Sequence, residues 1–335
     1  MDPSKEQWAA LYEAAQNVRQ LSPWDFLYES DVITIMLPGR DEPVYCSVIG
    51  SGGECYGVGV YPGYESFNGF CRMCEADDEE LSYLLGIEQN CMMCYFGSRE
   101  EISPKDREVL KALDLHFRGR NEWIYFRTMD KGFLPWYINS EQAELLTHTL
   151  QNFTMACTDF FEDKLEVDFD SGETLLRFYS PEKDLWINSA ERMAPIRIEK
   201  PRLIVNNEHL TAQLKKKKRN GAKLEFEVTY LPTPVQEHKK DRPYFPRLAL
   251  LMDRTNGLAL DQHMADMNDH IEGEILGMLT GYIDKFGRPL SIHVRDDRSG
   301  RYIGDFCEKT GIKVIEGEGM PAVDGLLEGM LDFLK

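Results

Sequence analysis

The sequence predicts two domains of different classes: an α+β domain over residues 1–190 and an α/β domain over residues 245–335, joined by a connecting segment, 191–244. The length of 335 residues exceeds the usual domain size of ~150 residues, which favours more than one domain. In the first part, short strands follow one another before helices intervene. In the last ninety residues, a hairpin precedes strictly alternating helices and strands, which is typical of a parallel sheet.

The amino-terminal part combines amphipathic helices with short strands. Ser4 and Gln7 form a capping-box pattern ahead of apolar residues at helical spacing, which predicts an opening helix. Ser103 before Pro104 is the matching signal for a later helix. In chain order we expect a helix over 4–18, strands at 32–36, 44–49 and 56–61, helices at 64–75 and 77–85, a strand at 91–96, a helix after Ser103, a strand at 123–129, a helix over 140–160 and three short strands between 165 and 188. The first three strands are expected to form an antiparallel meander.

The carboxyl-terminal part has the clearest pattern. Asn256-Gly257 between two apolar runs is a strong hairpin signal. Upstream, the prolines at 232, 234, 243 and 246 favour a domain connection, although that segment also contains a helix-like and a strand-like stretch. In chain order we expect a helix over 207–219, strands at 223–230, 247–253 and 258–262, a helix over 267–286, a strand at 290–295, a helix over 302–310, a strand at 312–315 and a final helix over 323–334.

The net charge of −19 is distributed unevenly. Residues 1–200 contain 18 basic and 36 acidic side chains, whereas residues 201–335 contain 20 and 21. Because DNA, RNA and anionic lipids attract basic surfaces, the acidic part is a poor candidate for binding them. One basic run, residues 215–219, is explained by a solvated helix end. A nucleic acid partner is therefore unlikely, and no apolar run is long enough to span a membrane.

Two cysteine pairs have the spacing of a zinc site. Cys71 and Cys74 form one pair and Cys91 and Cys94 the other, with sixteen residues between the pairs. Neither pair adjoins the Gly or Pro of a metal-binding turn, and residues three apart on a strand face opposite sides. We therefore interpret these thiols as core cysteines, and zinc is disfavoured. With no secretory signal ahead of them, the eight cysteines are expected to be reduced in the cytoplasm.

Carboxylates near the ends of two predicted strands are the candidate catalytic or metal-binding residues. Asp253 ends the first strand of the hairpin, and Asp296 and Asp297 follow the strand at 290–295. If those strands are neighbours, the carboxylates converge and could hold Mg²⁺ or Mn²⁺, with a third ligand, Asp324 or Glu328, from the last helix. The alternative is local: Asp253 begins a turn, and Asp296-Asp297 caps a helix.

Several segments resemble a family of uncharacterised bacterial proteins made of two domains of unknown function, and the resemblance spans nearly the whole chain. They are Trp8 with Tyr12, Pro23-Trp24, residues 45–50 with Gly53-Glu54, residues 117–120, Pro135-Trp136 and residues 244–247. No activity comes with that resemblance.

Residues 245–335 are also similar, in the order of their elements, to the ribonuclease H-like fold of integrases and transposases. In that superfamily acidic residues bind two metal ions and cut a phosphodiester. The predicted chain has two opening strands where this fold has three, unless residues 223–230 supply the third. A likeness of fold does not by itself carry a function to this chain.

These observations leave two functional hypotheses. The first is a cytoplasmic, non-enzymatic interaction or ligand-binding protein that needs no cofactor and recognises a protein or small molecule. The alternative is a metal-dependent, nuclease-like enzyme using Mg²⁺ or Mn²⁺ at Asp253 and Asp296, with Glu328 as a further catalytic candidate. Only the second hypothesis predicts tight binding of Mg²⁺ or Mn²⁺ at Asp253 and Asp296.

Overall fold

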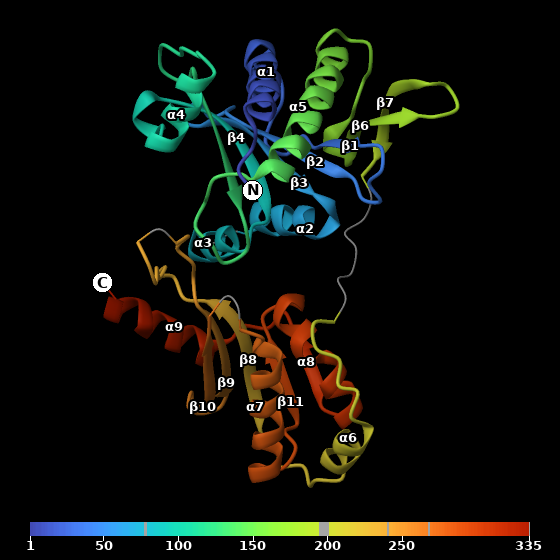
Figure 1. Cartoon of the computed structure of the whole chain (residues 1–335). Helices are drawn as coiled ribbons and strands as arrows, with labels where there is room; N and C mark the ends of the chain where they lie inside the picture. Colours follow the sequence, from blue (N-terminus) through green and yellow to red (C-terminus); the bar gives the residue numbers. More distant parts are fainter. Residues whose placement is uncertain (77–78, 194–200, 240, 267–268, 335) are drawn as a thin grey trace. The chain divides into compact units, whose positions relative to one another are not determined.

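The computed structural model describes residues 1–76, 79–193, 201–239, 241–266 and 269–334. The chain divides into two compact units (Figure 1). The first comprises Met1–Lys131 and Pro135–Arg197, and the second comprises Gly132–Leu134 and Ile198–Lys335. Each unit is built on its own β-sheet. The two units are described separately below.

The first unit is an α+β domain. Its principal elements are, in chain order, α1 (Lys5–Leu21), β1 (Ile33–Met36), β2 (Val44–Ile49), β3 (Tyr56–Pro62), α2 (Gly63–Cys74), α3 (Glu79–Ile87), β4 (Cys91–Gly97), α4 (Pro104–Ala112), β5 (Trp123–Met129), α5 (Ser140–Phe161), β6 (Glu173–Ser180) and β7 (Leu185–Arg192). The expected capping boxes are present: Ser4 caps α1, and Ser103 caps α4. Each satisfies backbone N–H groups that the first helical turn leaves without a partner.

The seven-stranded sheet of the first unit has the order β5-β4-β3-β2-β1-β6-β7. Strands β1 to β3 form the expected antiparallel meander, and β4 and β5 continue it. Strand β6 then pairs parallel to β1, with Ile33 opposite Leu175, and β7 folds back on β6. Helices α1 and α5 cover one face of this sheet, and α2 lies on the other (Figure 1).

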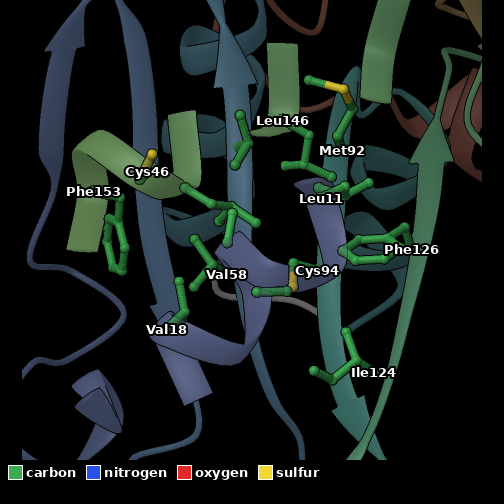
Figure 2. Close-up of a cluster of buried hydrophobic side chains, with 14 of the residues drawn as sticks. Leu11, Val18, Cys46, Val58, Met92, Cys94, Ile124, Phe126, Leu146 and Phe153 are labelled. Atoms are coloured by element: carbon green, nitrogen blue, oxygen red, sulfur yellow. The ribbon is translucent and has the colours of Figure 1, made fainter. Parts of the chain in front are cut away.

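The larger core of the first unit lies between the sheet and helices α1 and α5. Figure 2 shows Leu11 and Val18 of α1, Leu146 and Phe153 of α5, and Val58 of β3 pointing into one cluster. All five side chains are fully buried. On the opposite face, aromatic residues of β2 and β3 stack on those of α2, so both sides of this sheet are closed by apolar packing.

The second unit is an α/β domain with a five-stranded sheet. Its elements are α6 (Glu208–Lys215), β8 (Lys223–Tyr230), β9 (Arg247–Asp253), β10 (Ala259–Ala265), α7 (Ile271–Phe286), β11 (Ser291–Val294), α8 (Asp297–Thr310), β12 (Lys313–Glu316) and α9 (Pro321–Leu334). The strand order is β10-β9-β8-β11-β12. Strands β8, β9 and β10 are successively antiparallel, whereas β11 and β12 run parallel to β8.

The segment 191–244, expected to be a connection, instead supplies the central strand of the second sheet. Strand β8 pairs with β9 on one side and β11 on the other. The prolines that suggested a linker follow β8 rather than interrupt it, so they do not remove hydrogen bonds from the central strand. The third opening strand of the ribonuclease H-like order is therefore present at Lys223–Tyr230.

Other boundaries differ from the sequence patterns. Of the three short strands expected between 165 and 188, the structure has two, and the first part of that range contains a 3-10 turn (Phe169–Ser171) capped by Asp168. Helix α8 starts five residues before the expected residue 302, because Asp296 caps it. The predicted starts of two helices, Asp77 and Met267, lie outside the described residues.

Candidate functional site

One face of the second sheet is apolar, and the other carries buried charged side chains on its central strand beside an apolar cluster of β9 and α9. Alternation along β8 turns Leu224 and Phe226 into the core formed with α7 and α8. Glu225 and Glu227 therefore point to the opposite face, the face on which α9 packs through Val323. Their side chains are 0% and 4% exposed. Because buried carboxylates are costly without partners, this face is the candidate site.

Glu227 lies in the carboxyl-terminal half of β8, and its two oxygens have different surroundings. Oε1 accepts a hydrogen bond of 2.9 Å from the Ser299 hydroxyl, which itself accepts one of 3.0 Å from the backbone N–H of Val228. Oε2 lies 3.3 Å from Nε of Arg295 but has no hydrogen-bond partner among the described residues. Burial raises the pKa of Glu227 to about 7, and the Arg295 guanidinium only partly opposes that effect.

Arg295 connects Glu227 to the last helix. It directly follows β11, and its Nη2 lies 2.5 Å from the Asp324 carboxylate in the first turn of α9. The next residue, Asp296, accepts a hydrogen bond of 2.8 Å from Nε of Arg298. We define the Arg295 cluster as Glu227, Arg295, Asp296, Arg298, Ser299 and Asp324. It gathers three carboxylates at the carboxyl ends of the neighbouring parallel strands β8 and β11, where α/β sheets commonly bind ligands.

A second group of charges lies toward the amino-terminal end of β8. Glu225 accepts a hydrogen bond of 2.8 Å from Arg254 through Oε1. Its Oε2 accepts hydrogen bonds of 2.9 Å from the backbone N–H groups of Ala322 and Val323, at the start of α9. Glu225 thus caps α9 from the sheet, where the helix dipole favours a negative charge.

His293 completes this second group. Its Nδ1 lies 3.2 Å from the Glu318 carboxylate, and its Nε2 lies 3.2 Å from the Ser291 hydroxyl. Burial, together with the positive charge of Arg254, lowers the pKa of His293. We define the Glu225 cluster as Glu225, Arg254, His293 and Glu318.

The structure does not bring Asp253 and Asp296 together. Strand β8 lies between the strands that carry them, and β9 runs antiparallel to it. Asp253 is consequently level with Leu224 at the amino end of β8, whereas Asp296 lies beyond the carboxyl end of β11. The condition under which these carboxylates would converge, that their strands are neighbours, is therefore not met.

Asp253 and Asp296 each have a local role. The Asp253 carboxylate accepts backbone hydrogen bonds from Thr255 and Asn256 and so shapes the hairpin turn. Asp296 is the N-cap of α8 and accepts the backbone N–H of Arg298. Both interactions are the ones that aspartate commonly makes at turns and caps.

The other acidic candidates occupy different positions. Asp297 is the first residue of α8 and is partly exposed. Asp324 contacts Arg295, whereas Glu328, one helical turn further along α9, is exposed. Of the two residues proposed as a third ligand, only Asp324 therefore belongs to the Arg295 cluster.

The four cysteines of the zinc-like pattern belong to the first unit. Cys91 packs in the core beside α2, and Cys94 packs on the other face of the sheet beside α1, as their spacing on a strand predicts. Cys71 is partly buried and Cys74 is exposed, both on α2. Burial raises the pKa of the Cys91 thiol to about 12, so in the absence of a metal this side chain is a neutral thiol.

The residues around the Arg295 cluster do not fit a divalent cation. Within the described parts of the chain, no three His, Cys, Asp or Glu side chains are arranged to hold a metal ion. Arg295 contacts both Glu227 and Asp324, and Arg298 contacts Asp296. Each carboxylate therefore already faces a guanidinium, and a metal ion would have to displace a positive charge.

Glu225, Glu227 and Arg295 were not singled out from the sequence. Two glutamates alternating with Leu224, Phe226 and Val228 have the pattern of a strand with one solvated face. Nothing in that pattern indicates that α9 covers the polar face.

Comparison with known proteins identifies two families. A family model described as "Domain of unknown function (DUF7309)" matches residues 8–177, slightly more than half of the chain. This chain belongs to the DUF7309 family. A second model, "Domain of unknown function (DUF6930)", matches residues 210–331. The DUF7309 match lies in the first unit and ends within β6, and the DUF6930 match covers most of the second unit, including β8.

A solved structure with a distant likeness to part of this chain was also found. The HTLV-2 integrase catalytic core domain in complex with magnesium is 16% identical and aligns with a TM-score of 0.24. The alignment covers 36% of this chain and 74% of that one. No curated protein matches the chain. A search of the described helices for a segment that could cross a membrane finds none.

Proposed function

We propose that the protein is a cytoplasmic binding protein without catalytic activity, and that its second unit is a ribonuclease H-like scaffold whose acidic site is closed by its own arginines. The observation that carries this proposal is the position of Arg295. Its guanidinium lies between the Glu227 and Asp324 carboxylates, at the carboxyl ends of β8 and β11, where a catalytic metal would be needed. The eight free cysteines support a reducing compartment.

Arg295 places a permanent positive charge beside the carboxylates, where a divalent cation would otherwise place one. A guanidinium remains protonated at all physiological pH values and offers several donors to carboxylates. With Asp324 paired and Glu227 partly neutralised by its raised pKa, the cluster has little remaining charge to attract a metal. The cluster then fixes α9 on the sheet rather than performing chemistry.

The alternative is the metal-dependent nuclease. Three carboxylates, Glu227, Asp296 and Asp324, surround Arg295 at the carboxyl ends of two parallel strands, and this convergence favours the alternative. Under that hypothesis Arg295 would have to leave the cluster before metal binds. The two proposals therefore differ in how the wild-type protein and an Arg295 variant respond to Mn²⁺.

The test measures thermal melting with and without Mn²⁺. Wild type is expected to show no stabilisation, whereas Arg295→Gln, which removes the cation and leaves three carboxylates, is expected to be stabilised by Mn²⁺. The matched control is the double variant Glu227→Gln with Arg295→Gln, in which the loss of the buried carboxylate should reduce the response to Mn²⁺.

Two results would overturn the proposal. One is stabilisation of the wild-type protein by Mn²⁺. The other is metal-dependent cleavage of a phosphodiester substrate by wild type that is lost in Glu227→Gln. Either result would instead establish the nuclease-like alternative, with Glu227 rather than Asp253 as its carboxylate on the sheet.

A further inference from the structure

The second unit contains a cavity that is separate from both charged clusters. Its volume is about 860 Å³, within the range of about 300–1,000 Å³ that small-molecule sites occupy. Three parts of the unit form it: the segment between β8 and β9, the end of β10, and the outer side of α9. All three belong to the second unit, so the cavity can be examined within that unit alone.

Most of the cavity wall is apolar. Leu231, Val235 and Met264 contribute from the strands and the connecting segment, and Leu326 and Met330 contribute from α9. Met264 is 63% exposed and Val235 is 38% exposed, which is high for large apolar side chains that lie together. A contiguous apolar surface of this kind gains free energy when a ligand with an apolar body covers it.

Helix α9 leaves space on this side because it presents glycines. Gly325 and Gly329 both line the cavity, four residues apart on one helix face. A Cβ atom added at either position would meet no atom within 4 Å. The two glycines therefore leave room for the cavity, and any larger residue at either position would narrow it.

The polar part of the wall is acidic. The Tyr244 hydroxyl lies 2.9 Å from Oδ1 of Asp266 and 3.4 Å from Oε1 of Glu237, and all three residues line the cavity. A phenol has one proton, so it can donate to only one of the two carboxylates at a time. The Arg247 guanidinium donates to the backbone carbonyls of Asp266 and Asp269 rather than to these carboxylates.

No described residue that lines the cavity carries a positive charge, and neither carboxylate forms an ion pair with a described residue. Burial, together with the hydrogen bond to Asp266, raises the pKa of Tyr244 to about 12. Tyr244 therefore remains a neutral donor at physiological pH. The remaining acceptor oxygens favour a ligand that brings its own positive charge.

We propose that this cavity binds an amphiphilic organic cation, whose alkyl or aromatic body lies against the apolar wall and whose positively charged amino group lies between Glu237 and Asp266. Carboxylates together with an aromatic ring are a common arrangement for recognising ammonium groups. The inference does not depend on the Arg295 cluster, and it holds whether or not the second unit cleaves phosphodiesters.

The test uses isothermal titration calorimetry on the full-length protein with two probes that share one chain length. n-Octyltrimethylammonium carries a positive head group and n-octyl sulfate a negative one, and both are used below the concentration at which they form micelles. The cation is expected to bind roughly tenfold or more tightly than the sulfate, and added salt is expected to weaken the binding of the cation.

Three variants assign the binding to this cavity. Asp266→Asn removes one negative charge and is expected to lower the affinity for the cation by roughly tenfold. Asp261→Asn removes the same charge from an exposed position on β10, which Asp266 directly follows, outside the cavity wall, and is expected to leave the affinity for the cation unchanged. Gly325→Leu fills the space beside α9 and is expected to abolish binding while the helix remains folded, because leucine favours a helix more than glycine does.

The proposal is overturned by any of three results. The first is equal affinity for the two probes, which would indicate an apolar surface with no preference for charge. The second is undiminished binding in Gly325→Leu, which would place the cation elsewhere. The third is the lack of measurable cation binding by wild type in the millimolar range.

Discussion

The two charged clusters under α9 differ in how completely they satisfy a buried carboxylate. Glu225 and Glu227 are two residues apart on one strand face, and both are buried. Glu225 is bonded to Arg254 and to two backbone N–H groups of α9, whereas Glu227 leaves one oxygen without a hydrogen-bond partner. Burial alone therefore does not distinguish a structural carboxylate from a candidate functional one. The two carboxylates are distinguished by whether each buried oxygen has a hydrogen-bond partner.

The largest expected effect concerns the satisfied carboxylate. Glu225→Ala should reduce the free energy of unfolding by about 3–5 kcal/mol, because it leaves Arg254 partly buried without its carboxylate and removes the cap from α9. Urea denaturation of the variant and wild type measures this difference. Glu225→Gln, which keeps one acceptor oxygen, is the control and should lose less. A loss below about 1 kcal/mol for Glu225→Ala would remove the distinction between the clusters.

The next effect concerns Glu227 and depends on pH. Its pKa is about 7 in the folded state against an ordinary value of 4.5. Between these values the folded state binds more protons than the unfolded state, so this residue makes stability decrease as pH rises. Glu227→Gln imitates the protonated form. We expect the free energy of unfolding of this variant to equal that of wild type near pH 4.5 and to exceed it by roughly 1–3 kcal/mol at pH 8.

Unfolding free energies at the two pH values test this sign. If Glu227→Gln is instead less stable than wild type at pH 8, Arg295 stabilises the ionised carboxylate more than burial penalises it. The two clusters would then behave alike, and the raised pKa would not mark a special site.

The smallest expected effect concerns Asp253, beside the Glu225 cluster but outside it. Its carboxylate only accepts hydrogen bonds within its own turn, so Asp253→Asn should change the unfolding free energy by less than about 0.5 kcal/mol. Thermal melts of the variant at neutral pH measure it. A clear rise in melting temperature would indicate like-charge repulsion at Asp253, which the position of the strands does not provide.

Most of the fold follows from local patterns. Helix caps such as Ser4 and Ser103, the Asn256-Gly257 hairpin and the meander of β1 to β3 depend on neighbouring residues and were predictable. The pairing of β8 was not predictable. Prolines separate β8 from β9, and β11 is distant from it in sequence. Strand type is local information, whereas strand order is not.

The candidate site was only partly predictable for the same reason. The sequence identified Asp296 and Asp324, which belong to the Arg295 cluster, but offered Asp253 as a neighbour of Asp296 only on the condition that their strands are adjacent. Glu227 could be selected only after β8 was known to be central and its polar face known to lie under α9. A carboxylate on a strand that is assigned to a connecting segment has no reason to be buried or to have a perturbed pKa.

The parallel pairing of β1 with β6 has a consequence for synthesis. Strand β1 is made early, yet its second neighbour starts at Glu173, after the whole of α5 has emerged from the ribosome. Until then a nascent chain carries the sequence Ile33–Met36 as an apolar strand with one unsatisfied edge, a form prone to pairing with other chains. Translation that stalls between α5 and β6 should therefore yield fragments that aggregate or recruit chaperones, whereas fragments that include β7 should not.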